Sequence, residues 1–283
     1  FPHDGVNDPI DGGFCCDQHV YYERTRGLFI WLLQYREGGN GNRQRIAVAN
    51  SQQDVLNNTW YWYDLTPGMF GFAQSDHWLD FPDLTVSDGN LYVVTKIHRL
   101  STPFAVPTNI VARIPLNQLA QGSAITVGYT VVQLQGVSCT DGATTTMYFG
   151  AHVNTTTLRV YSWADGSGTI SWHDVSHAAY NRGAMVATDP DGYNFASHAD
   201  DWIWGAWAAN GVLGFMWPAA QGGGFPYPHV QVVRVNPATF SLLSQVQIWS
   251  TDLAFIYPSV HPNDRGHLGG SIAFGGGSAS PGC

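Results

Sequence analysis

Acidic and imidazole side chains recur in this chain where strand-like segments begin. Asp17 and His19 open the first such segment, Asp83 opens a second, and Asp201 precedes an apolar third. Glycoside hydrolysis needs one protonated and one ionised carboxyl group, about 5 Å apart for retention or about 6.5–9.5 Å apart for inversion. We predict Asp17, Asp83 and Asp201 as catalytic carboxylates, with His19 beside them. Because Asp is also a favoured turn residue, capping a turn is the alternative role for each.

A histidine and a tyrosine near the C-terminus indicate a second chemistry. His261 and Tyr257 can act as base and acid of a polysaccharide lyase, with Arg265 neutralising a uronate. A structural role for these histidines is the alternative. The expected substrate-binding side chains are Gln18, Trp78, His152, Trp202 and Arg265. Most tryptophans are expected to pack between strands, but Trp78 lies in a Gly- and Asp-containing segment and is expected to be exposed.

No metal or cofactor site is predicted. His173 and His177 have the i, i+4 spacing of a zinc pair, but no helical pattern presents them. Residues 189–194 alternate oxygen ligands as a calcium loop does, without the bidentate acid downstream. A structural calcium ion is the alternative, at this loop or at the polar residues of the N-terminal arm, which are Asp4, Asn7, Asp8 and Asp11.

Composition narrows the class of protein and of partner. The 283 residues include 32 Gly and are 13% aromatic but only 12% charged, which is typical of a turn-rich β protein. The net charge of −9 disfavours nucleic acid, whose phosphates must be neutralised by Lys and Arg. The longest apolar run, residues 28–33, is too short to span a bilayer. We therefore expect a monomer that acts on carbohydrate, with no nucleic acid or membrane partner.

Four cysteines indicate disulfides and an oxidising compartment. Sequence alone leaves three pairings open. We favour a vicinal bridge between Cys15 and Cys16, with a second bridge between Cys139 and Cys283. In the alternative, Cys15 or Cys16 bonds to Cys283.

Two further features indicate secretion. Asn57 and Asn154 each open an Asn-x-Thr sequon and are expected glycosylation sites. The chain opens without Met or an apolar leader, as a mature secreted form does. We expect an extracellular protein.

A pattern of strand, turn and apolar strand recurs along the chain. Its starts, roughly 55 to 65 residues apart, lie near Asp17, Asp83, Met147, Trp202 and Pro258. Such a period is typical of a four-stranded propeller blade, whereas a β-sandwich shows no sequence repeat of this length. We predict an all-β fold, one β-propeller domain over residues 1–283, with five blades and six as the alternative.

The final repeat has room for only two strands before the chain ends. We expect the N-terminal arm, residues 1–13, to supply a missing strand and close the ring, because closure removes exposed strand edges. In a propeller the loops that enter the innermost strands gather at one mouth of the central channel. Polar groups from separate repeats are therefore expected to converge there.

Three segments carry a resemblance to a known group of proteins. They are Phe-Cys-Cys-Asp-Gln-His-Val-Tyr-Tyr (14–22), Ala-Thr-Thr-Thr-Met-Tyr-Phe-Gly-Ala-His (143–152) and Gly-Ala-Trp-Ala-Ala-Asn-Gly-Val-Leu-Gly-Phe-Met-Trp (205–217). The chain resembles secreted, sialidase-like β-propeller proteins of bacteria and fungi, related to the Asp-box group. The resemblance implies the propeller fold more than an activity. Our first hypothesis is a glycan-cleaving enzyme, and the alternatives are a lectin-like module or a structural extracellular protein.

Overall fold

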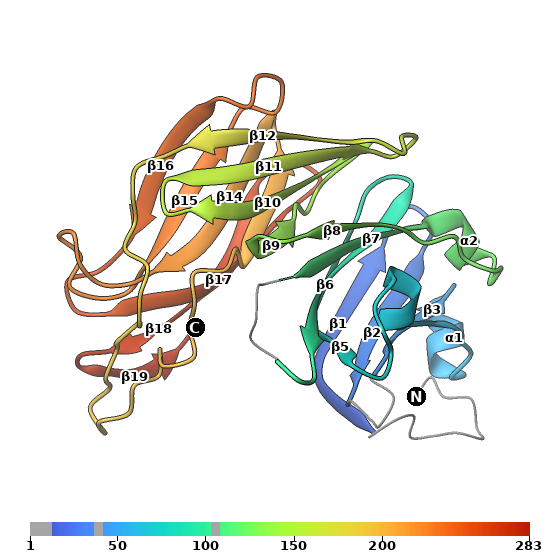
Figure 1. Cartoon of the computed structure of the whole chain (residues 1–283), viewed down its shortest axis with the longest axis horizontal. Coiled ribbons are helices and arrows are strands. Elements are labelled where there is room, and N and C mark those ends of the chain that lie inside the picture. The colour runs from blue at the N-terminus through green and yellow to red at the C-terminus, as the bar shows by residue number, and fades with distance from the viewer. Residues whose placement is uncertain (1–12, 37–41, 103–107) are drawn as a thin grey trace. The chain divides into compact units, whose positions relative to one another are not determined.

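The computed structural model describes residues 13–36, 42–102 and 108–283 (Figure 1). These residues form five antiparallel sheets, each built from strands that follow one another in the sequence. The predicted fold class is confirmed: the protein is an all-β, five-bladed β-propeller. The chain divides into two compact units, Phe1–Gln133 and Leu134–Cys283.

The first unit holds two four-stranded blades. Their strands are β1 (Phe14–Glu23), β2 (Leu28–Tyr35), β3 (Gln44–Ala49) and β4 (Tyr61–Leu65), then β5 (His77–Val86), β6 (Asn90–Arg99), β7 (Asn109–Pro115) and β8 (Gly128–Val132). Three short helices connect strands: α1 (Gln52–Leu56), η1 (Pro67–Phe70) and α2 (Leu116–Ala120). The first eight residues of β6 are all buried, which agrees with the near-continuous apolar pattern of its sequence.

The second unit holds three blades. The first comprises β9 (Gln135–Cys139), β10 (Thr146–Asn154), β11 (Thr157–Ala164) and β12 (Ile170–Ser176). The next comprises β13 (Gly205–Ala209), β14 (Val212–Ala219), β15 (His229–Val235) and β16 (Leu242–Ile248). The last has three strands, β17 (Ala254–Pro262), β18 (Leu268–Gly276) and β19 (Ala279–Gly282).

The opening strands of three blades share an irregularity. Cys16, Phe81 and Tyr257 have positive φ angles of 30°, 47° and 49°, which are unusual for residues other than Gly. Each lies where its strand shifts register against the next one, and in β5 and β17 the residue precedes a proline. A β-bulge bends its strand and re-aims the side chains around it. In these three blades the opening strand therefore contains a backbone irregularity that redirects its side chains.

Two details of the predicted repeat were wrong. The third blade begins at β9, one strand before the predicted start near Met147, because the short segment Gln135–Cys139 pairs with β10. The last blade has three strands rather than two, because Ala279–Gly282 turns back to pair with β18. The predicted contribution of the N-terminal arm to ring closure falls on residues 1–12, which lie outside the described residues.

The vicinal disulfide between Cys15 and Cys16 is confirmed. The predicted bridge between Cys139 and Cys283 was wrong, because neither of these residues takes part in a disulfide. Cys139 is 5% exposed in β9, whereas Cys283 is exposed at the C-terminal residue. A disulfide forms only where the Cα atoms of the two cysteines lie within about 7 Å of each other.

Candidate functional site

The bulge in β5 brings two carboxylates to one face of the sheet. Asp80 pairs with Lys96, and Asp83 pairs with Val94, so Phe81 and Pro82 together oppose a single residue. Side chains two residues apart on a strand share a face, and cross-strand partners share a face as well. Asp80 and Asp83 therefore point the same way, although a regular strand would place residues three apart on opposite faces.

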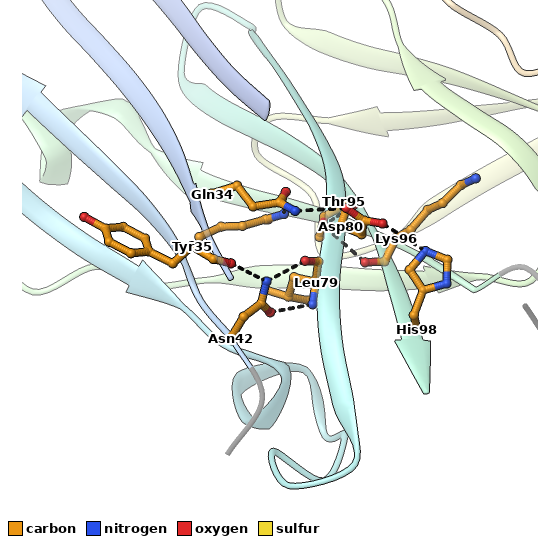
Figure 2. A network of polar contacts seen from close by, with 9 residues as sticks. Gln34, Tyr35, Asn42, Leu79, Asp80, Thr95, Lys96 and His98 are labelled. Carbon is orange, nitrogen blue, oxygen red and sulfur yellow. Dashed lines mark hydrogen bonds and ion pairs between the residues drawn. The ribbon is translucent and has the colours of Figure 1, made fainter. Parts of the chain in front are cut away.

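Asp80 is the centre of a polar network. Gln34 Nε2 donates a hydrogen bond of 2.9 Å to Asp80 Oδ1, and His98 Nε2 lies 3.5 Å from Asp80 Oδ2. Figure 2 shows Gln34 and His98 approaching Asp80 from two sides. The Asp80 side chain is 14% exposed, so part of it still reaches solvent. This is the arrangement of a carboxylate that is oriented by the protein and accessible to a small reactant.

The buried residues behind Asp80 fix the direction of its donor. Gln44 Nε2 donates to Gln34 Oε1 at 3.2 Å, so the amide nitrogen of Gln34 points to Asp80. Asn42 joins the two sheets at the same level: its Nδ2 donates to Tyr35 O and Leu79 O, and its Oδ1 accepts from Leu79 N (Figure 2). These hydrogen bonds hold the side chains of Gln34 and Asn42 in one orientation each.

Replacing the central amide tests this network. We expect Gln34→Leu to lower the free energy of unfolding by about 1–3 kcal/mol, because it leaves Gln44 and Asp80 without a buried partner. Urea unfolding measures the change. Gln52→Leu, at an exposed position on α1, is the matched control and is expected to have little effect. Equal stability of the two variants would contradict the assigned role of Gln34.

Asp17 lies within electrostatic reach of Asp80. Burial raises the pKa of the Asp17 carboxyl group, the negative charge of Asp80 raises it further, and His19 opposes the rise. Burial and a neighbouring negative charge both favour the protonated form of a carboxyl group. Asp17 is therefore suited to donate a proton, while Asp80 is the carboxylate that the network orients.

Two other predicted residues of the first unit, His19 and Asp83, lie beside these acids. His19 Nδ1 lies 3.7 Å from Asp83 Oδ1, so Asp17, His19 and Asp83 belong to one cluster. Gln18 Oε1 accepts a hydrogen bond of 3.1 Å from the indole of Trp31 and is exposed. The predicted catalytic group is Asp17, Asp83 and Asp201 with His19. Of these residues, Asp17, His19 and Asp83 lie in the first unit, and the catalytic roles of all four stay predictions.

Aromatic rings border the cluster. Trp78 is half-buried rather than exposed as expected, because its ring packs on His98 with centroids 5.1 Å apart. The residue Lys96 is 8% exposed, and its ammonium nitrogen lies 5.2 Å from the ring centroid of Phe81, a residue of the bulge. A cation over an aromatic face is stabilised by the ring quadrupole. Lys96, the single lysine of the chain, is also the cross-strand partner of Asp80.

Asp201, the third predicted carboxylate, lies in the second unit. It is 4% exposed and accepts hydrogen bonds from Gln135 Nε2 at 2.7 Å, Tyr180 OH at 2.5 Å and Arg182 Nε at 2.5 Å. A buried carboxylate with this many donors is strongly held by the protein. Its predicted catalytic role stays a prediction.

His152 packs beside this cluster. The residue is 2% exposed, and its ring lies 4.8 Å from that of Trp217 and 5.6 Å from that of Tyr180. Burial lowers the pKa of His152 to about 4, against the opposing charge of Asp201. The imidazole is therefore neutral at pH 7, and its predicted part in substrate binding stays a prediction.

The other predicted residues of the second unit are spread over β17 and the loops. Tyr257 packs edge-on against Trp204, which also stacks with Trp202, and burial raises the pKa of Tyr257. His261 Nδ1 lies 3.2 Å from Asp141 Oδ2. Arg265 is exposed in the turn between β17 and β18. The lyase roles of Tyr257, His261 and Arg265 stay predictions.

The segment considered as a calcium loop, residues 189–194, forms a turn, and the two sequons lie at exposed positions. Asp189 Oδ1 accepts hydrogen bonds from Asp191 N and Tyr193 N, which is a turn closed by its own side chain. Within residues 13–36, 42–102 and 108–283, no group of three or more His, Cys, Asp or Glu could hold a metal ion. Asn57 and Asn154 are both exposed, and their glycosylation stays a prediction. Asp4, Asn7, Asp8 and Asp11 lie outside the described residues.

Sequence reasoning missed three residues of the first cluster: Asp80, Gln34 and His98. Gln34 is a polar residue near the end of an otherwise apolar strand, which is a usable signal for a buried hydrogen bond. Asp80 stands three residues before Asp83, and only the bulge between them puts both on one face. The sequence pattern of residues 77–86 does not by itself predict that bulge.

Comparisons with known proteins place the fold only loosely. No family model and no curated protein matches the sequence. Similar solved structures include an α-L-arabinofuranosidase from Lactobacillus brevis, with 10% identity, a TM-score of 0.40 and coverage of 92% of this chain and 82% of that one. A lignostilbene dioxygenase from Pseudomonas brassicacearum has 11% identity, a TM-score of 0.42 and coverage of 93% and 58%.

A structure from a study of two prolyl endopeptidases has 10% identity, a TM-score of 0.34 and coverage of 93% and 42%. None of these similarities supports an inference on activity, and none is specific to sialidases. The propeller implied by the sialidase-like resemblance is confirmed by the sheets themselves. No helix of the described residues is long and apolar enough to cross a membrane.

Proposed function

We propose that the protein is a secreted glycoside-cleaving enzyme whose site is the acidic cluster of the first unit. The observation that supports this proposal is the pairing of two unlike carboxyl groups. Asp17 has a raised pKa, and Asp80 is oriented by Gln34 and His98. Pairs of carboxyl groups whose environments separate their roles are the basis of glycoside hydrolysis.

The proposed roles follow from these environments. Protonated Asp17 donates its proton to the oxygen of the leaving sugar, and carboxylate Asp80 acts either on water or directly on the sugar carbon. His19, with Asp83, adjusts the charge next to Asp17. The anomeric configuration of the first product distinguishes the two roles of Asp80, because a nucleophile retains configuration and a general base inverts it.

Asp17→Asn tests the proposal on a panel of plant and microbial polysaccharides. We expect kcat to fall about 10²–10⁴-fold, because a general acid is removed. Stability at neutral pH is expected to rise, because a carboxyl group with a raised pKa stabilises the fold only while protonated, and that contribution is lost as the pH rises. Thermal unfolding measures the second effect and shows that the variant is folded. Full activity of Asp17→Asn on every cleaved substrate would refute the assignment.

Glycan binding without catalysis is the second candidate function. The observation that favours it is Trp172, a 52% exposed ring on β12. The guanidinium carbon of Arg159 lies 3.8 Å from the centroid of that ring, and Asp174 accepts two hydrogen bonds from Arg159. A rigid exposed aromatic face of this kind suits a sugar ring. Under this candidate the wild-type protein binds glycans of the panel and releases no product.

A further inference from the structure

A cavity of about 510 Å³ lies within the second unit, between the sheet β13–β16 and the strands β17 and β18. Its volume is within the range of small-molecule sites, which are mostly apolar with a few placed polar groups. Its apolar lining includes Trp207, Val232, Val246, Ile248 and Leu268. Val246 and Leu268 are 49% and 46% exposed, so apolar side chains reach the solvent-facing part of this lining.

The floor of the cavity is formed by the indole ring of Trp207, which packs on the neighbouring strand at a glycine. Trp207 pairs with Gly214, and a Cβ atom at Gly214 would overlap the indole ring. The glycine thus lets the ring lie flat across β14. Close approach of a large ring to a strand is a known use of glycine.

One charged side chain lines this cavity. Arg234 pairs with Gly214 on β14 and with Ser244 on β16, so it shares a row and a face with the indole of Trp207. Within the described part of the chain, Arg234 takes part in no ion pair and no side-chain hydrogen bond. A guanidinium group on an apolar cavity is suited to pair with a carboxylate.

Beyond the row of cross-strand partners that contains Arg234, the next two rows on this face of the sheet are apolar. Val232 pairs with Val246 in the next row, and Val230 pairs with Ile248 in the row after it. Four residues along a strand span roughly 13 Å. The floor therefore offers a cation at one end and an apolar track leading away from it, which is the complement of an extended amphiphile with an anionic head.

We propose that this cavity binds a hydrophobic monocarboxylate, such as a medium-chain fatty acid, with its carboxylate on Arg234 and its chain along Val232, Val246 and Ile248. The proposal uses none of the residues assigned to glycan cleavage. Fatty-acid binding at this cavity is therefore independent of glycan cleavage by the first unit.

Isothermal titration of the full chain with octanoate, decanoate and 1-octanol tests this site. We expect saturable binding, an affinity that rises about fourfold for each added methylene group, and tighter binding of octanoate than of 1-octanol by tenfold or more. Arg234→Gln is expected to remove the preference for octanoate over the alcohol. Val246→Trp is expected to block both ligands by filling the cavity.

Arg36→Gln is the matched control, because it removes one positive charge from an exposed position in the first unit. This variant is expected to bind octanoate as the wild type does. An unchanged preference for octanoate in Arg234→Gln would overturn the proposal. Absence of saturable decanoate binding to the wild type would overturn it as well, and would indicate that a peptide segment or another protein occupies the cavity.

Discussion

Asp80→Asn is expected to lower kcat on any cleaved glycan by about 10²–10⁴-fold, the usual worth of a positioned acid or base. The substitution preserves shape, and an Asn oxygen can still accept the hydrogen bond from Gln34. Loss of activity would therefore report the lost charge rather than a lost fold. The measurement is initial rate at saturating substrate, with unfolding curves to confirm that the variant is folded.

The pH profile of the residual activity supplies a second readout. The charge of Asp80 is one cause of the raised pKa of Asp17, so its removal lowers that pKa. The wild-type enzyme is expected to lose activity as the pH rises through the pKa of Asp17, because the general acid loses its proton. In Asp80→Asn this alkaline limb is expected to move to lower pH.

Asp88→Asn is the control for Asp80→Asn. Asp88 is exposed in the turn between β5 and β6, so the control removes one negative charge from the same blade. It is expected to leave kcat and the alkaline limb unchanged. If both variants lose activity equally, net charge rather than a specific carboxylate controls the reaction, and the assignment of Asp80 is wrong.

His152→Phe is expected to make the protein resistant to acid. The pKa of His152 is lowered to about 4, mainly by burial, whereas an exposed histidine titrates near 6.5. Below pH 6.5 the His152 side chain binds a proton in the unfolded chain but not in the folded chain. The free energy of unfolding therefore decreases as the pH falls toward 4. The full loss corresponds to about 3 kcal/mol. Phe retains a ring against Trp217 and Tyr180 but binds no proton.

The measurement is the free energy of urea unfolding at pH 7 and pH 5. We expect His152→Phe to exceed the wild type at pH 5 by about 2 kcal/mol relative to their difference at pH 7. His267→Phe changes an exposed histidine in the turn before β18 and is expected to follow the wild-type pH dependence. Parallel curves for the wild type and His152→Phe would show that His152 does not cause acid lability.

Much of the architecture could be predicted from the sequence because it depends on local chemistry. Alternating turns and apolar strands predict the blades, since Gly-rich turns end strands and apolar segments such as Leu28–Tyr35 must be buried. Adjacent cysteines made the Cys15–Cys16 bridge a specific expectation. The third and fifth blades were misread because short strands, Gln135–Cys139 and Ala279–Gly282, carry weak patterns and form only by pairing with a neighbour.

The geometry of the candidate site, in contrast, depends on contacts between residues that are far apart in the sequence. Residue types alone selected Asp17, His19, Asp83 and Asp201 as candidates, because acids and histidines at strand starts stand out in a chain with so little charge, and their roles stay predictions. The sequence could not rank Asp80 above Asp83, since the bulge at Phe81 and Pro82 decides which acid meets Gln34 and His98. Backbone bulges and the burial of charges arise from pairing between distant strands, and the pKa of a carboxyl group follows from that burial.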